Sequence, residues 1–237
     1  VMNMLQPPSA EHIFGTDELG RDVFSRTILS AQVSMQVSVI SVSFALFFGT
    51  AAGVLTGYFG GWLDNVLMRV VDVLFAFPVL LLALAIVAIL GPGIGTATFA
   101  IGVVYVPIFA RVARSSAVSV VQEPYVKAAK TVGASPIRTI LTHLLPNIAA
   151  PLIVQTSVSL AFAILNEAAL SFLGLGAQPP TPTWGRMLFD AKGFLEQAWW
   201  MAVFPGATVF LTVLAFNLLG DNLRDALDVT VDRKESK

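Results

Sequence analysis

Residues 73–110 read VLFAFPVLLLALAIVAILGPGIGTATFAIGVVYVPIFA and contain no Asp, Glu, Lys or Arg. A single helix of this length would measure about 57 Å, whereas crossing the hydrocarbon core of a bilayer takes about 30 Å. The breakers Gly91-Pro92-Gly93-Ile94-Gly95 lie in the middle of the stretch. We therefore predict two membrane-spanning helices, at 73–90 and 96–112, joined by a tight turn.

Three further apolar runs flank this pair. Residues 27–63 also lack charged side chains, and their densest part predicts a span at 37–58. Two more spans are predicted at 148–165 and 199–219. Only 12% of the residues are charged, compared with about 25% in soluble domains. The sequence therefore predicts an all-α integral membrane protein with five visible transmembrane helices and a transmembrane domain at 27–220.

Composition excludes several classes of function. The formal net charge is −1, and the sequence has two histidines and no cysteine. The commonest metal-ligand clusters, a disulfide framework and a global attraction to nucleic acid are therefore excluded. The glycines of the turn lack the Lys and Ser/Thr of a phosphate-binding loop, and no catalytic triad stands out. We expect no catalytic residue, no metal, no cofactor bound by this chain and no nucleic-acid partner.

Lysine and arginine concentrate in alternate connecting segments, and positive residues favour the cytoplasmic side of a membrane. With the C-terminal tail inside, the inner segments hold Arg69, Arg111, Arg114, Lys127, Lys130, Arg138, Arg224, Arg233, Lys234 and Lys237, and the outer ones hold Arg21, Arg26, Arg186 and Lys192. This orientation makes 123–146 a cytoplasmic loop, 221–237 a cytoplasmic tail, and 1–26 and 176–198 external segments. Five spans place the two ends on opposite sides, and no feature would carry 1–26 across the membrane. We therefore expect a further span upstream.

The cytoplasmic loop between the third and fourth spans has the pattern of two short helices. Pro124 suits the first turn of a helix, and Gly133 suits the left-handed residue that ends one. Ser135 then suits the cap of a second helix that begins at Pro136 and closes at Pro146. The sequence predicts a helix, a glycine turn and a second helix.

The first of these helices has a narrow apolar face, at i, i+3, i+4 and i+7, formed by Tyr125, Ala128, Ala129 and Val132. An isolated helix of about ten residues is marginally stable in water, so it needs a surface to dock on. That surface is either the inner side of this chain or a separate cytoplasmic protein, and the pattern alone leaves both open.

Other positions have a functional and a structural interpretation. Gly49, Gly53 and Gly57 form a stripe that serves close helix packing, within this chain or against a partner permease. Asn166 and Glu167, just past the predicted span end, suggest an external mouth or a solvated interface.

Two further features concern the ends of the spans. Arg69 and Asp72 are spaced to pair along one helix, as a solvated pair or as a second contact with a cytoplasmic protein. Trp199 and Trp200 follow an amphipathic stretch in the external segment, at a membrane boundary that tryptophan favours. That segment is expected to form an external cap, and an ordinary structured loop would have a similar sequence.

The cytoplasmic loop resembles the EAA signature of binding-protein-dependent ABC permeases. Ala128, Ala129, Gly133, Leu145 and Pro146 match at the expected spacing, whereas Lys127 stands where the signature usually has Glu. The resemblance implies that the short helix docks into a groove on an ATPase. The coupling residues it implies are Glu123, Tyr125, Ala128, Ala129, Val132, Gly133, Leu145 and Pro146.

Longer motifs are similar to the C-type subunit of the dipeptide/oligopeptide/nickel permease subfamily. They are HIFGTDELGRDVFSR at 12–26, ALSFLGLGAQPPTPTWG at 169–185 and NLLGDNLRDALD at 217–228. The resemblance implies an ABC importer type I permease fold, with six spans in the full-length subunit, in the inner membrane of a prokaryote. The implied partners are membrane lipid, a homologous permease in a heterodimer, one or two cytoplasmic ABC ATPases that bind ATP and Mg, and an external substrate-binding protein.

The expected function is import of di- or oligopeptides by alternating access, with nickel chelates, glutathione or another small solute as alternatives. An ion-coupled secondary transporter and an intramembrane enzyme are rival hypotheses. Both would need ionisable groups inside the spans, and the predicted span cores contain none.

Overall fold

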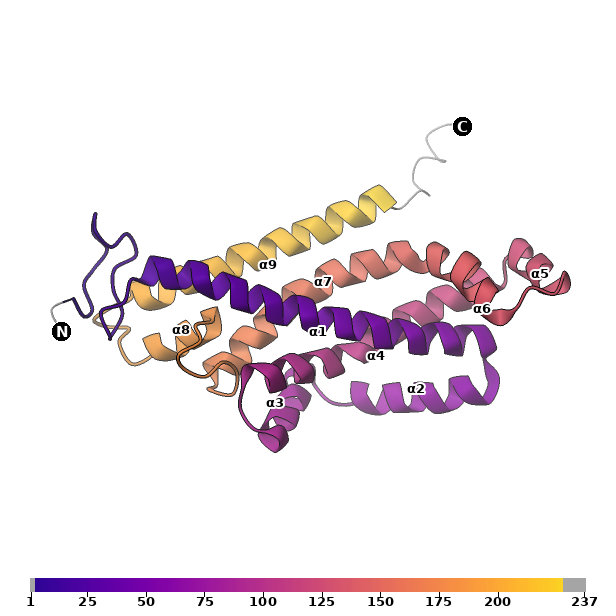
Figure 1. Ribbon diagram of the computed structural model, residues 1–237, viewed down its shortest axis with the longest axis horizontal. Helices are drawn as coiled ribbons and strands as arrows, with labels where there is room; N and C mark the ends of the chain where they lie inside the picture. Colours follow the sequence, from indigo (N-terminus) through magenta and orange to yellow (C-terminus); the bar gives the residue numbers. More distant parts are fainter. Residues whose placement is uncertain (1–2, 228–237) are drawn as a thin grey trace. The chain divides into compact units, whose positions relative to one another are not determined.

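The computed structural model describes residues 3–227, and these residues form helices and connecting loops (Figure 1). The helical elements in this part of the chain are α1 (Val23–Phe59), α2 (Gly61–Phe75), α3 (Val79–Leu90), α4 (Ile94–Val121), α5 (Pro124–Thr131), α6 (Pro136–Thr139), the π-helical turn η1 (Ile140–Leu144), α7 (Leu145–Phe172), α8 (Trp184–Ala191) and α9 (Trp200–Leu227).

The described residues divide into two compact units. Unit 1 takes its residues from 3–41, 80–101 and 160–215, and unit 2 from 42–79, 102–159 and 216–227. The long helices α1, α4, α7 and α9 contribute to both units, and each unit is described by itself below.

Four helices are long and apolar enough to cross a membrane: α1, α4, the continuous stretch Pro136–Phe172, and α9. α1, α4 and the stretch 136–172 contain the spans predicted at 37–58, 96–112 and 148–165 and extend beyond them at both ends, whereas α9 begins one residue after the start of the span predicted at 199–219 and ends eight residues after it. The helices continue past Arg111, Glu167 and Arg224 because a charged side chain ends an apolar run without interrupting the backbone hydrogen bonds of a helix. Residues 221–227 of the predicted tail are helical, and 228–237 lie outside the described residues.

The prediction of one straight helix at 73–90 is wrong. Residues 73–75 form the end of α2, and α3 begins only at Val79 after a bend of 90°. Pro78 explains the break, because it lacks an N–H and its ring clashes with the carbonyl four residues earlier. The two helices satisfy the criteria for a span only as a bent pair. The predicted tight turn after α3 is present, with Gly91 at φ 93°.

Several polar residues of the long helices donate a hydrogen bond to the preceding turn of the same helix. On α1 the hydroxyl of Thr27 donates to the carbonyl of Val23 at 2.8 Å, and that of Ser38 donates to the carbonyl of Ser34 at 2.9 Å. Such bonds to the preceding turn let Ser and Thr stay inside an apolar helix. One side of α1 is lined by four buried serines, Ser30, Ser34, Ser38 and Ser41, of which only Ser38 donates within α1 and the other three donate to other elements.

The N-terminal segment is folded against the rest of unit 1. Asp17 is buried and accepts hydrogen bonds from the backbone N–H of Leu19 and Arg21 at 2.9 and 2.8 Å, and from Nε of Arg21 at 2.6 Å. The ring of Phe14 stacks on that of Phe204, with centroids 3.9 Å apart. Trp200, which the sequence predicts at a membrane boundary, is buried within the protein, and its Nε1 donates to the carbonyl of Thr16 at 3.0 Å. The HIFGTDELGRDVFSR motif therefore forms a structured cover on this unit.

Candidate functional site

The α5–α6 segment of unit 2, residues 123–146, begins with the predicted helix and glycine turn. Pro124 occupies the first turn of α5, and Gly133 follows the helix at φ 83°. The N–H of Ala134 donates to the carbonyl of Ala129 at 3.0 Å, and that of Gly133 to the carbonyl of Lys130 at 3.1 Å. This pair of bonds is a Schellman motif, which fixes the direction in which the chain leaves α5.

The second helix of the segment begins as predicted and does not end as predicted. The hydroxyl of Ser135 accepts from the N–H of Arg138 at 3.3 Å, and Pro136 occupies the first turn of α6. Pro146 does not close the helix, since α6 continues through η1 into α7. η1 ends one residue before Leu145-Pro146, and its wider turn changes the hydrogen-bond pattern at the place where Pro146 has no N–H to donate. The Asn147 side chain donates to the carbonyl of His143 at 2.6 Å. Leu145 and Pro146 therefore belong to the first turn of α7.

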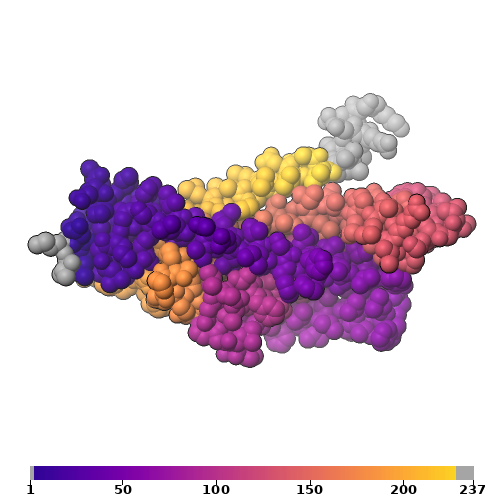
Figure 2. Space-filling model, in the orientation of Figure 1, coloured from indigo at the N-terminus to yellow at the C-terminus, as the bar shows by residue number. Residues whose placement is uncertain are grey.

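The apolar face of α5 is largely uncovered. Tyr125 is 43% exposed and Val132 is 84% exposed, Ala128 is exposed, and Ala129 is half-buried. Figure 2 shows the α5–α6 segment, whose bulk is drawn in salmon to pink. Glu123, also exposed, stands at the N-cap without a side-chain capping bond. A face of this kind is available to another protein.

The opposite side of α5 anchors the helix to its own unit. Val126 is completely buried, and Nζ of Lys130 lies 4.3 Å from the centroid of the Tyr58 ring at the end of α1. The ring of Tyr125 meets that of His143 edge to face, with centroids 5.9 Å apart. The short helix is therefore held in place by its Val126 side while it presents Tyr125, Ala128 and Val132 outward.

The glycine stripe of α1 lies against α4 within unit 2. A Cβ on Gly49 would lie 2.6 Å from Cβ of Phe109, and one on Gly53 would lie 2.6 Å from Cβ of Ala113. A Cβ on Gly57 would lie 2.7 Å from Cβ of Ala117. The structure thus places the stripe in contact with this chain's own helix rather than leaving it open to a partner permease.

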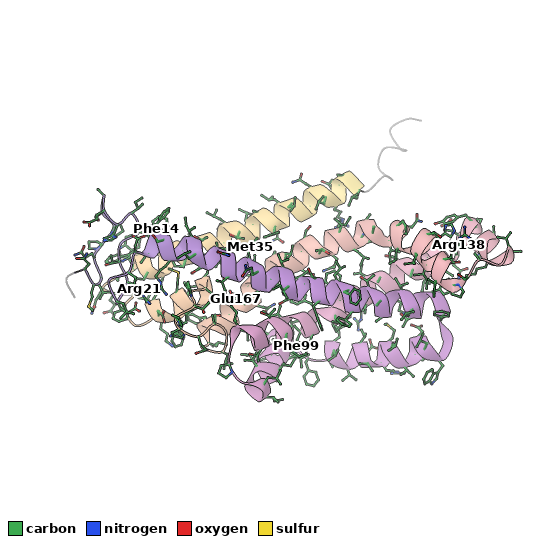
Figure 3. The ribbon with its side chains drawn as sticks, in the orientation of Figure 1. Phe14, Arg21, Met35, Phe99, Arg138 and Glu167 are labelled. Atoms are coloured by element: carbon green, nitrogen blue, oxygen red, sulfur yellow. The ribbon has the colours of Figure 1, made fainter. Side chains whose placement is uncertain are left out.

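Glu167 is placed differently from the prediction of an external mouth or solvated interface. α7 continues to Phe172, so Glu167 lies inside the helix, and its side chain is buried between α1 and α7 in unit 1 (Figure 3). The hydroxyl of Ser34 donates to Oε2 at 3.0 Å, and that of Ser171 donates to Oε1 at 2.7 Å. The neighbouring Asn166 is half-buried.

The two serines connect Glu167 to residues 177 and 184, beyond the end of α7. Oγ of Ser171 accepts from the N–H of Ala177 at 3.1 Å, and Oγ of Ser34 accepts from the N–H of Trp184 at 3.4 Å. Glu167 therefore fixes α1, α7 and the start of α8 through shared hydroxyl groups. Sequence reasoning missed Ser34, although the spacing of the four serines along α1 was a signal that one side of this helix receives a polar partner.

Replacing Glu167 with Ala is expected to destabilise unit 1 by about 1–3 kcal/mol, because Ser34 and Ser171 would lose their acceptor in a buried site. Thermal unfolding of the purified protein in detergent measures the change. Glu167→Gln keeps the size and one carbonyl acceptor, and should fall between the two. An Ala variant that unfolds at the wild-type temperature would contradict the assignment of a structural network.

Asp72 pairs with α4 and not with Arg69. Its Oδ1 accepts from Nη2 of Arg111 at 2.8 Å, and the Arg111 guanidinium also lies 3.8 Å from the centroid of the Phe75 ring. The predicted pair with Arg69 is wrong because the carboxylate of Asp72 pairs with Arg111 of α4 instead. Arg69 remains without an ion pair to any described residue.

Together these features define a polytopic helical membrane protein with an exposed helix, held on one side, between two of its spans. Residues 49–233 match the family described as binding-protein-dependent transport system inner membrane component. The chain is 51% identical over 226 residues to the dipeptide transport system permease protein DppC of Alkalihalophilus pseudofirmus, covering 95% of this chain and 74% of that protein. It is 47% identical over 226 residues to the glutathione transport system permease protein GsiD of Escherichia coli, covering 95% of this chain and 75% of that protein.

Solved structures show the same fold. An inward-facing form of the MetNI methionine ABC transporter matches with a TM-score of 0.69 at 18% identity, covering 85% of this chain and 96% of that chain. An amino acid ABC transporter with histidines matches with a TM-score of 0.66 at 14% identity, covering 86% of this chain and 95% of that chain.

The chain belongs to the family of binding-protein-dependent transport system inner membrane components. It is a permease subunit of an ABC importer and resides in the inner membrane. Membership implies an ATPase and a substrate-binding protein as partners.

Proposed function

We propose that this chain forms part of the translocation pathway of an importer for di- or oligopeptides, and that partner subunits hydrolyse the ATP. The 51% identity with a dipeptide permease over 95% of the chain supports the peptide cargo. ATP and Mg would then be bound by the ATPases, with no cofactor on this chain, and the 123–146 segment would lie on the cytoplasmic side.

The exposed face of α5 is the observation that carries this proposal. Tyr125, Ala128 and Val132 are apolar and exposed, on a helix too short to be stable by itself. Two alanines of the face, Ala128 and the half-buried Ala129, allow close approach, and the surrounding signature is the one that docks an ATPase in related permeases. A groove on an ATPase is the partner that fits this helix.

Transport would follow from movement of the docked helix. The Schellman turn ties α5 to α6, and α6 continues through η1 into α7 without interruption. Closure of the ATPases would therefore displace α7 through α5, a rigid-body change between two packed states. Alternating access requires that the moving helix belong to the pathway, and α7 is a membrane-spanning helix.

A homologous permease would complete the pathway as a heterodimer. The glycine stripe is already in contact with α4, so a partner would use another surface. Unit 2 has an apolar groove of about 620 Å³ between α1 and α7, with the exposed ring of Phe47 at its edge. A membrane-spanning helix of the partner is suited to this groove, because its lining is apolar and offers small residues such as Ala51 and Ala149.

Glutathione is the second candidate cargo, supported by the 47% identity with a glutathione permease. The test is uptake of a radiolabelled dipeptide and of radiolabelled glutathione, by cells that lack their own peptide permeases and express the complete transporter with its binding protein. We expect dipeptide uptake to exceed glutathione uptake at least tenfold, and to stop on ATP depletion. Preferential glutathione uptake would replace the peptide assignment, and uptake that survives ATP depletion would contradict the ATP-driven mechanism.

A further inference from the structure

Unit 2 contains a polar cavity of about 580 Å³ between α2 and α4 that transport does not explain. Three guanidinium groups, of Arg69, Arg111 and Arg114, and two carboxylates, of Asp64 and Asp72, line it. The cavity therefore carries a surplus of one positive charge. A concave site with this surplus attracts an anion.

Two of the arginines form the wall of the cavity. Arg114 binds Asp64 in a bidentate pair, with Nε to Oδ1 at 2.5 Å and Nη2 to Oδ2 at 2.6 Å. Arg111 uses Nη2 for Asp72 and packs over Phe75. A guanidinium has five N–H donors, so each of these arginines keeps donors that its carboxylate does not use.

Arg69 is the arginine of the cavity whose guanidinium is not paired with a carboxylate of a described residue. Its side chain is exposed, lines the same cavity, and makes no ion pair with any described residue. The surplus charge of the cavity is therefore concentrated at Arg69, on the α2 side.

An exposed apolar stripe of α2 runs beside Arg69. Its members recur at i, i+4, i+8 and i+11, and they are Trp62 (77% exposed), Val66 (41%), Val70 (56%) and Val73 (61%). Arg69 is three residues after Val66 and four before Val73, so it borders this stripe on the helix surface. Four apolar side chains facing outward from a membrane protein are suited to contact with acyl chains.

The cavity also lies at the right depth for a lipid headgroup. The apolar run of α4 ends at Arg111, while the helix continues to Val121. Arginines at the end of an apolar run place their charge at the membrane surface. Trp62, on the stripe, has the amphipathic ring that favours the same level.

We propose that the α2–α4 cavity binds the phosphate of an anionic phospholipid. The phosphate oxygens accept hydrogen bonds from Arg69 and from the unused donors of Arg111 and Arg114, and the acyl chains lie along the Trp62–Val73 stripe. Basic cavities between membrane helices bind anionic headgroups in this way. The proposal does not depend on the identity of the transported cargo.

The test is native mass spectrometry of the complete transporter, released from detergent after incubation with phosphatidylglycerol or phosphatidylcholine. We expect retention of phosphatidylglycerol in preference to phosphatidylcholine. Arg69→Gln should reduce that retention about fivefold, the effect of removing one basic residue near an anionic surface. Arg69→Lys should retain most of it. Arg224→Gln, which removes an exposed arginine from α9, is the matched control and should leave retention unchanged.

The same experiment gives a different result for each alternative occupant of the α2–α4 cavity. Displacement of phosphatidylglycerol by millimolar inorganic phosphate would show that a free anion fills the site and would overturn the lipid assignment. Equal retention of phosphatidylglycerol and phosphatidylcholine by the wild-type transporter would also overturn the lipid assignment. So would equal retention of phosphatidylglycerol by wild type and by Arg69→Gln. Loss of the ATPase subunits from the Arg69→Gln complex, with lipid retention unchanged, would make Arg69 a protein contact.

Discussion

Ala128→Glu is expected to abolish substrate uptake while leaving the permease inserted and folded. Ala128 is exposed on the outward face of α5, so a glutamate there meets no neighbour within this chain. In the proposed complex it would place a charge in the apolar contact with the ATPase, and burying an unpaired charge costs several kcal/mol. Uptake of labelled dipeptide and the amount of folded permease, measured in the same membranes, separate the two effects.

Lys127→Glu is the matched control for that substitution. Lys127 is adjacent in sequence and exposed, but it lies away from the apolar face, and the family signature usually has Glu there. We expect Lys127→Glu to retain uptake. Normal uptake by Ala128→Glu in a complex that contains its ATPases would refute docking through this face.

Gly133→Val tests the same coupling through the backbone. Gly133 has φ 83°, and a Cβ added to it would have no atom within 4 Å. Valine would therefore be disfavoured there by the left-handed backbone conformation and not by a steric clash with another residue. A β-branched residue is strongly disfavoured there, and the Schellman turn should open. The expected result is loss of uptake with the ATPases still bound, because α5 would no longer transmit its movement to α6 and α7.

Local sequence signals predicted the α5–α6 segment well and its continuation poorly. Pro124, Gly133 and Ser135 each act within one turn of the chain, and all three stand where the sequence placed them. Pro146 was misinterpreted because the π-helical turn before it depends on a wider hydrogen-bond ring that no residue type marks uniquely. Pro78 was overlooked because its neighbours are so apolar that the run resembles one span.

The misplacement of Glu167 has a different physical cause. A prediction of spans from runs without charged residues ends a span at every carboxylate. The carboxylate of Glu167 can nevertheless be buried inside the protein, because the hydroxyl groups of Ser34 and Ser171 donate hydrogen bonds to it. Ser34 is far away in the sequence and reaches Glu167 only after α1 and α7 pack. The burial of Trp200 was not predicted for the same reason, since its partner is the distant carbonyl of Thr16. Pairings between distant residues depend on packing, which local patterns do not report.

Gly53→Ala is expected to destabilise the folded protein strongly, because the added methyl group has no room between α1 and α4. The new Cβ would lie 2.6 Å from Cβ of Ala113 and 2.7 Å from the backbone nitrogen of Arg114, and would also contact the carbonyl oxygen of Ala110. Two of these three atoms belong to the backbone of α4 and cannot move aside, so α1 and α4 would have to separate. Overpacking costs about 1–3 kcal/mol where side chains yield, and we expect at least the upper value here.

Gly95→Ala supplies the matched control, because it adds the same methyl group to a helical glycine with no atom within 4 Å of the new Cβ. Alanine exceeds glycine in helix propensity by about 1 kcal/mol, so this variant should be neutral or slightly more stable. Size-exclusion chromatography of detergent-solubilised protein, followed by thermal unfolding, compares the two. We expect Gly53→Ala to yield little monodisperse protein and Gly95→Ala to match wild type. Equal yields and unfolding temperatures for both variants would mean that α1 and α4 do not meet at Gly53, and that the small-residue stripe is open to another helix.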